Sequence, residues 1–301
     1  MAKLIFENWE ERCSSLGNIL TNKKVWTEEN EKRVKELECE RDLGINKNGN
    51  KVKWTQTKQD ELEKLIDKRD GPDQLPAGAI THLEDVFRRE FWGRERILNN
   101  KYLDKGKICE EDALDLKSKV DGQFYKKNKE KLSNGYIKGE PDNRQDIIRD
   151  AKSNFDMESF DKAELTSQYE WQIKGYCWLD GKTKGELFYA LVNNPWHQLE
   201  AEKKRVWYSM GMPEEQEERW QQVALQVEQN MIFDYEKFMK DNPNGDLIMQ
   251  DNRYDIPAKL RIKSFDVTLT QEDIDFIKSR ALLAREWLIN KEIETLKLIN
   301  G

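Results

Sequence analysis

The sequence has few histidines, no closely spaced cysteines and no long hydrophobic run. No apolar stretch approaches the roughly 20 residues that a membrane-spanning helix needs, and the apolar run at the N-terminus is too short for a secretory signal. We therefore expect a cytoplasmic protein without a membrane partner. The four cysteines include no CxxC pair and only two histidines are present, which argues against a zinc or iron–sulfur site.

The charge balance is acidic, with a formal net charge of −7 and charged residues making up 36% of the chain. This balance argues against adhesion to nucleic acid through bulk charge. It does not exclude an enzyme that acts on DNA, because phosphate contacts depend on local patches. At 301 residues the chain is long enough for one large domain or two modest ones.

Helical periodicity dominates the first 130 residues, and strand patterns follow. The expected helices cover residues 27–41, 57–69, 80–99, a stretch from Cys109, 166–179, 196–208, 214–240 and 271–298. The expected strands cover residues 136–140, 146–152, 186–192 and 259–268. We predict an α+β fold in which a small sheet is set among many helices, with the first two strands joined by the polar turn 142–145.

Two acids and a lysine lie close together in this strand region. Asp142 follows the first strand and Asp150 lies near the end of the second, so a hairpin or bent sheet would bring the two carboxylates together, where they repel unless a cation lies between them. Lys152 is two residues beyond Asp150 and faces the same side of a strand. Such a group suits metal-assisted cleavage of a phosphodiester. Taken alone, an Asp-x-Lys triplet more often marks a polar hairpin surface.

Three further side chains add to the pattern. Gln172 and Tyr176 lie four apart and share one face of an otherwise aromatic and apolar helix, where a glutamine is either exposed or directed into a site. Glu110 stands at the start of a helix, where an acid favours the helix dipole whatever else it does. It is also a candidate third metal ligand.

In order along the chain, these elements resemble the PD-(D/E)XK nuclease superfamily, in the branch with a Gln-x-x-x-Tyr helix. That branch includes YqaJ-like viral recombinases, lambda exonuclease and RecB-type nuclease domains. The matching motifs are Gly106 to Glu110, Pro141-Asp142, Asp150-Ala151-Lys152 and Gln172 to Tyr176. The resemblance implies a restriction-endonuclease-like core, a small central mixed sheet flanked by helices, within residues 101–301. Residues 1–100 would form a mostly helical region packed on that core, and the core would carry added C-terminal helices and strands, all in one compact unit.

The resemblance also implies a Mg²⁺ site, with Mn²⁺ as a substitute, and no iron–sulfur cluster, since no cysteine follows Cys177. The implied metal ligands are Glu110, Asp142, Asp150 and the carbonyl of Ala151. Lys152 would be the catalytic lysine, supported by Gln172 and Tyr176.

By the same resemblance, the 5′-phosphate of DNA would be taken by Arg12 with Ser14 or Ser15. Lys126 and Lys127 precede the first strand and suit a phosphate track, although a solvated charged face explains them equally well.

The function implied is that of a Mg²⁺-dependent exonuclease on linear duplex DNA in viral-type recombination or repair, working in the host cytoplasm if viral. A single-strand annealing protein and further copies of the chain are its expected partners. Two alternatives stay open. One is an endonuclease of the same fold on branched or specific DNA, and the other is a non-catalytic DNA-binding or assembly subunit with a relict site.

Overall fold

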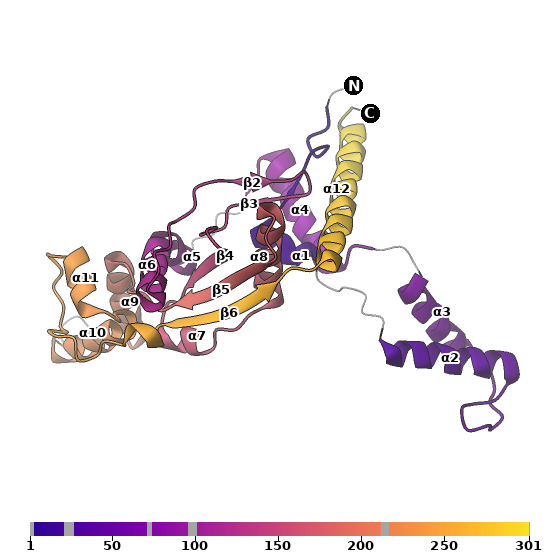
Figure 1. Cartoon of the computed structure of the whole chain (residues 1–301), viewed down its shortest axis with the longest axis horizontal. Helices are drawn as coiled ribbons and strands as arrows, with labels where there is room; N and C mark the ends of the chain where they lie inside the picture. Colours follow the sequence, from indigo (N-terminus) through magenta and orange to yellow (C-terminus); the bar gives the residue numbers. More distant parts are fainter. Residues whose placement is uncertain (1–2, 21–26, 71–73, 96–100, 212–216, 301) are drawn as a thin grey trace.

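The computed structural model describes residues 3–20, 27–70, 74–95, 101–211 and 217–300. Figure 1 shows a central body of strands and helices with helical projections at both ends. The helices are α1 (Leu16–Leu20), α2 (Glu28–Leu43), α3 (Gln56–Asp70), α4 (Ala77–Trp92), α5 (Lys101–Ile108), α6 (Glu110–Asp121), α7 (Met157–Asp161), α8 (Ser167–Asp180), α9 (Trp196–Ser209), α10 (Glu217–Met231), α11 (Tyr235–Asp241) and α12 (Gln271–Asn300). The strands are β1 (Glu11–Arg12), β2 (Leu132–Ser133), β3 (Ile137–Gly139), β4 (Ile148–Ser153), β5 (Lys184–Ala190) and β6 (Ile262–Thr268).

The strands form two small mixed sheets. In the larger sheet, β5 lies between β4, to which it is parallel, and β6, to which it is antiparallel. In the smaller sheet, β3 pairs with β1 in parallel and with β2 antiparallel. Helices α6 and α8 both pack against β4 and β5. The predicted α+β class is therefore confirmed.

Helix α8 lies at the centre of the main core. It contacts α1, β3, β4 and β5, and its buried Ile173 belongs to one apolar cluster with Leu16, Ile137 and Leu187. Because α8 contacts both sheets, its polar side chains can contact residues of either sheet. No helix in the described part of the chain combines the length and apolar character that crossing a bilayer requires.

The predicted strand hairpin around residue 142 is wrong, because β3 and β4 belong to different sheets. Only a single antiparallel bridge, between Asn143 and Arg149, closes the turn. The second strand begins at Ile148 rather than at residue 146. The carboxylate of Asp146 instead binds the Arg149 guanidinium, with Nη1–Oδ1 at 2.5 Å.

Two predicted helices also differ from the structure. The helix expected over 80–99 begins at Ala77 and ends at Trp92, with Gly93 in the left-handed conformation (φ 61°) as its cap, and residues 96–99 lie outside the described residues. The helix expected over 214–240 is divided into α10 and α11, and its residues 214–216 likewise lie outside the described part. It breaks because the Asn193 side-chain oxygen accepts the backbone N–H groups of Phe233 and Asp234.

Candidate active site

Strand β4 directs Asp150 and Lys152 to the same side of the larger sheet. The Lys152 Nζ lies 2.6 Å from Asp150 Oδ2, and the Asp150 side chain is only 4% exposed. The same ammonium lies 4.8 Å from the centre of the Tyr169 ring. Burial lowers the pKa of Lys152, but the charge of Asp150 and its hydrogen bond outweigh burial and raise the pKa above its ordinary value. The amine therefore stays protonated.

Gln172 of α8 connects the acid, the lysine and a tyrosine. Its Nε2 donates to Asp150 Oδ1 and to the Tyr176 hydroxyl, both at 3.1 Å. Its Oε1 accepts from Lys152 Nζ at 3.4 Å. Since the two ends of the amide meet partners of opposite polarity, only one amide orientation satisfies the network.

Tyr176 fits below this network because Gly139 of β3 carries no side chain. A Cβ at position 139 would lie 2.5 Å from Tyr176 Cε1. Burial, followed by the charge of Asp150, raises the pKa of the Tyr176 hydroxyl well above its ordinary value, so the group remains protonated. The tyrosine is thus a neutral support for Gln172.

Asp142 reaches the same place from the turn that precedes β4. Its Oδ2 accepts the Ala151 backbone N–H at 2.7 Å. The turn is held by buried Asn143, whose Nδ2 donates to the Lys126 carbonyl at 2.9 Å. Burial, and then the charges of Asp150 and Glu110, raise the pKa of Asp142 well above its ordinary value. Like charges crowded in a partly buried place are a common electrostatic signature of a cation site.

Glu110 lies in the first turn of α6, where its Oε2 is 3.2 Å from Lys127 Nζ. Among the described residues, no three acidic, histidine or cysteine side chains converge into a ready ligand set. Lys152 and Lys127 instead serve as the counter-charges of Asp150 and Glu110. Asp150 Oδ2 is buried and lies 2.6 Å from the Lys152 ammonium. Carboxylate oxygens are the ligands that Mg²⁺ prefers, so Glu110, Asp142 and Asp150 fit a hard divalent cation by donor type.

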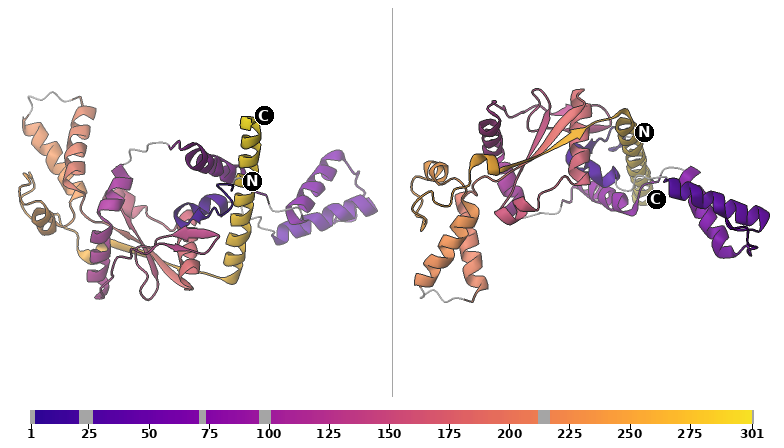
Figure 2. Two further views of the ribbon diagram at one scale, coloured as in Figure 1. Left: turned by 90° about the horizontal axis from the view of Figure 1, so that it is seen from above. Right: turned by 60° about the horizontal axis from the view of Figure 1, so that its bottom comes forward.

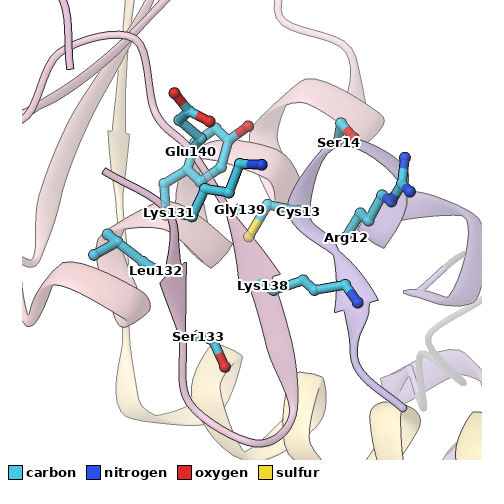
Figure 3. Close-up of a pocket in the computed structure, with 10 residues that line it drawn as sticks. Arg12, Cys13, Ser14, Lys131, Leu132, Ser133, Lys138, Gly139 and Glu140 are labelled. Atoms are coloured by element: carbon cyan, nitrogen blue, oxygen red, sulfur yellow. The ribbon is translucent and has the colours of Figure 1, made fainter. Parts of the chain in front are cut away.

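A pocket of about 600 Å³ borders Tyr176 and carries several cationic side chains. Arg12 and Ser14 line it, as do Lys131, Lys138 and Glu140. Figure 3 shows Lys131 and Lys138 extending toward the side of the pocket that carries Arg12. By contrast, the Ser15 hydroxyl donates to Glu11 Oε1 at 2.7 Å, and Ser15 does not line the pocket.

A second hollow, of about 620 Å³, is lined by the residues that precede Lys131 in the same chain segment. Its lining includes Lys126, Lys127, Lys129 and Arg144. Residues 126–133 thus contribute to both hollows, and Lys127 joins this one to Glu110. Sequence reasoning missed Lys138 and Arg144, because an isolated basic residue in a strand or turn carries no motif of its own.

The comparisons with known proteins give structural likenesses to solved exonucleases. A phage-related exonuclease from Haemophilus somnus 129PT superposes with a TM-score of 0.59 at 20% identity, over 95% of this chain and 96% of that one. The alkaline exonuclease LHK-Exo from Laribacter hongkongensis superposes with a TM-score of 0.45 at 11% identity, over 76% and 88% of the two chains. Its complex with dAMP gives 0.44 at 11% identity, over 75% and 86%.

No protein-family model and no curated protein matches the sequence. The chain has the fold of the phage-related exonuclease, over nearly its whole length. The predicted likeness to phage-type exonucleases is confirmed for the fold alone.

Proposed function

We propose that this protein is a Mg²⁺-dependent exonuclease that hydrolyses linear duplex DNA. The observation that carries the proposal is the buried network in which Lys152 contacts both Asp150 and Gln172 while Asp142 lies beside them. A polar hairpin on the surface would leave these side chains in water. Here they are held in one orientation at the meeting point of two sheets, in a protein with the fold of a known exonuclease.

Asp142, Asp150 and Glu110 would hold the metal. When bound, Mg²⁺ would polarise the scissile phosphate and lower the pKa of a coordinated water. The chain's own contribution is to position charge: Lys152 stays protonated and held by Gln172, and can stabilise charge on the phosphate or orient the attacking water. Lys127 pairs with Glu110 Oε2, so metal binding by that carboxylate would compete with this ion pair.

The pocket beside Tyr176 is the proposed site for the 5′-phosphate at the end of the substrate. Arg12, Lys131 and Lys138 supply cationic donors there and Ser14 supplies a hydroxyl. A terminal phosphate carries more charge than an internal phosphodiester, so this pocket would select an end. The second hollow, with Lys126, Lys129 and Arg144, would hold the phosphates on the far side of the cleavage point.

A role in viral-type recombination or repair follows from this activity, because an exonuclease on duplex ends produces single strands for an annealing partner. Assembly of several copies around the duplex is part of the same proposal.

Digestion of matched linear and covalently closed DNA tests the proposed activity. The wild-type protein is expected to degrade the linear duplex in Mg²⁺ or Mn²⁺ and to spare the closed circle, with 5′-phosphorylated ends cut faster than 5′-hydroxyl ends. Lys152→Ala should lose this activity. Lys162→Ala is its matched control, because Lys162 is exposed and forms an ion pair only with Glu158 among the residues that the structure describes. Cleavage of the closed circle would indicate an endonuclease, and binding without cleavage would indicate a relict site.

A further inference from the structure

Helices α2 and α3 form an arm with a hydrophobic cluster of its own. Val34 and Leu37 of α2 pack against Leu62 of α3, and this cluster is separate from the main core. Arg33 joins the two helices through a two-pronged pair with Glu61, in which Nε and Nη2 each lie 2.8 Å from a carboxylate oxygen. The views of Figures 1 and 2 show the arm standing away from the body.

The tip of this arm, defined as residues 43–55, has a charge unlike that of the rest of the chain. It contains three lysines, Lys47, Lys51 and Lys53, and no acidic residue, in a protein whose net charge is −7. All three lysines are exposed. Lys47 is 3.3 Å from Glu36, whereas Lys51 and Lys53 form no ion pair with any residue that the structure describes.

The tip is held in shape by its own hydrogen bonds. The Asn46 side-chain oxygen accepts the backbone N–H groups of Asn48 and Asn50, both at 3.0 Å, and Gly49 adopts a left-handed conformation with φ 77°. Ile45 and Lys51 form an antiparallel bridge. The loop is therefore already ordered in the free protein. A ligand that binds its lysines would not have to offset the conformational entropy of ordering the loop.

We propose that the tip of the α2–α3 arm binds the phosphate backbone of the duplex substrate, away from the active site. This inference rests on the proposed function, which supplies a long polyanion as the substrate. A protein partner fits the tip less well. A stable protein interface needs about 800 Å² per partner with an apolar centre, whereas Leu43 is the one large apolar side chain of the tip that is more than half exposed.

The length of the arm determines how long a DNA duplex must be to reach the tip. Helix α2 has 16 residues and spans about 24 Å, or roughly seven base pairs at 3.4 Å each. A duplex that barely fills the active site would therefore not reach the tip. A duplex of about 40 base pairs would extend well beyond the body.

The test compares the triple variant Lys47→Gln, Lys51→Gln, Lys53→Gln with a control triple variant. The control, Lys32→Gln, Lys35→Gln, Lys64→Gln, removes the same charge from exposed positions on the flanks of the arm. Fluorescence anisotropy would measure the Kd for duplexes of about 10 and about 40 base pairs, with Ca²⁺ replacing Mg²⁺ to prevent cleavage, across a series of salt concentrations. Each lost phosphate contact lowers the slope of log K against log salt by about 0.9.

We expect the tip variant to bind the longer duplex about tenfold or more weakly, with a salt slope smaller by roughly 2 to 3, and the short duplex as well as the wild type does. The control variant should keep wild-type affinity for both. If the wild type binds the longer duplex and the tip variant binds it equally well, this inference is overturned and the proposed function still stands. A changed oligomeric state with unchanged DNA affinity would assign the tip to a protein contact and also overturn it. A wild type that binds neither duplex overturns both proposals.

Discussion

Replacing Asp142 by asparagine should make the metal-free protein more stable while it removes activity. The ionised carboxylate of Asp142 is partly buried and lies near the charges of Asp150 and Glu110, which together raise its pKa. Every unit by which a pKa is raised costs about 1.4 kcal/mol at a pH above that pKa. Asparagine carries no charge, and its side-chain oxygen can still accept the Ala151 N–H.

The expected gain is at least about 1 kcal/mol in the free energy of unfolding at pH 8 in EDTA, a rise in Tm of roughly 2 °C or more. The pH dependence follows from the direction of the shift. Because the folded-state pKa lies above the unfolded value, the wild type loses stability as pH rises from about 4 through the folded-state pKa. The advantage of Asp142→Asn should therefore be small near pH 4 and complete above the folded-state pKa.

Urea denaturation at several pH values, in EDTA and in Mg²⁺, measures the effect. Mg²⁺ should stabilise the wild type by mass action and stabilise Asp142→Asn much less. Asp146→Asn is a matched control of opposite sign, because the Arg149 hydrogen bond lowers the pKa of Asp146, so its loss should destabilise the protein. A less stable Asp142→Asn protein at pH 8 in EDTA would refute the account of crowded like charges at this site.

Three further predictions concern the network, the pocket and a buried lysine. Gln172→Met should lower kcat about 10²-fold or more with little change in DNA affinity, since the amide holds Lys152 rather than the substrate; an unchanged kcat in single-turnover digestion would argue against that role. Arg12→Gln should reduce the preference for 5′-phosphate over 5′-hydroxyl ends about tenfold, the equivalent of about 1.4 kcal/mol, and a preference that stays the same would remove Arg12 from end recognition. Burial lowers the pKa of Lys105 to about 7, so wild-type stability should rise by up to about 1.4 kcal/mol per pH unit between about pH 7 and 10 relative to Lys105→Met. If urea denaturation gave both proteins the same slope of unfolding free energy against pH, this prediction would be contradicted.

The parts of the site that the sequence predicts are those with a local period. Asp150 and Lys152 share a side of β4 because alternate residues of a strand do so, and Gln172 and Tyr176 share a face of α8 because they are four apart. The contact between the β4 pair and the α8 pair depends on the packing of α8 against both sheets, which no local sequence pattern predicts. The order of motifs along the chain is what pointed to it.

The parts that the sequence does not predict depend on distant residues. Strand β1 has two residues, too few for a periodic signal, and exists through its pairing with β3 more than a hundred positions away. The break between α10 and α11 depends on Asn193, about 40 residues upstream, which binds the free backbone N–H groups of Phe233 and Asp234. The hairpin prediction failed for the same kind of reason, because β4 pairs with β5 instead of with the strand that precedes it.

The most direct test of a metal-dependent nuclease centre is single-turnover digestion of an end-labelled, 5′-phosphorylated linear duplex by the wild type and by Lys152→Ala. The wild type should release nucleotides in Mg²⁺ and stop in EDTA, and Lys152→Ala should be slower by about 10³-fold while it still binds the DNA. Full activity in Lys152→Ala, or digestion by the wild type that continues in EDTA, would contradict the account.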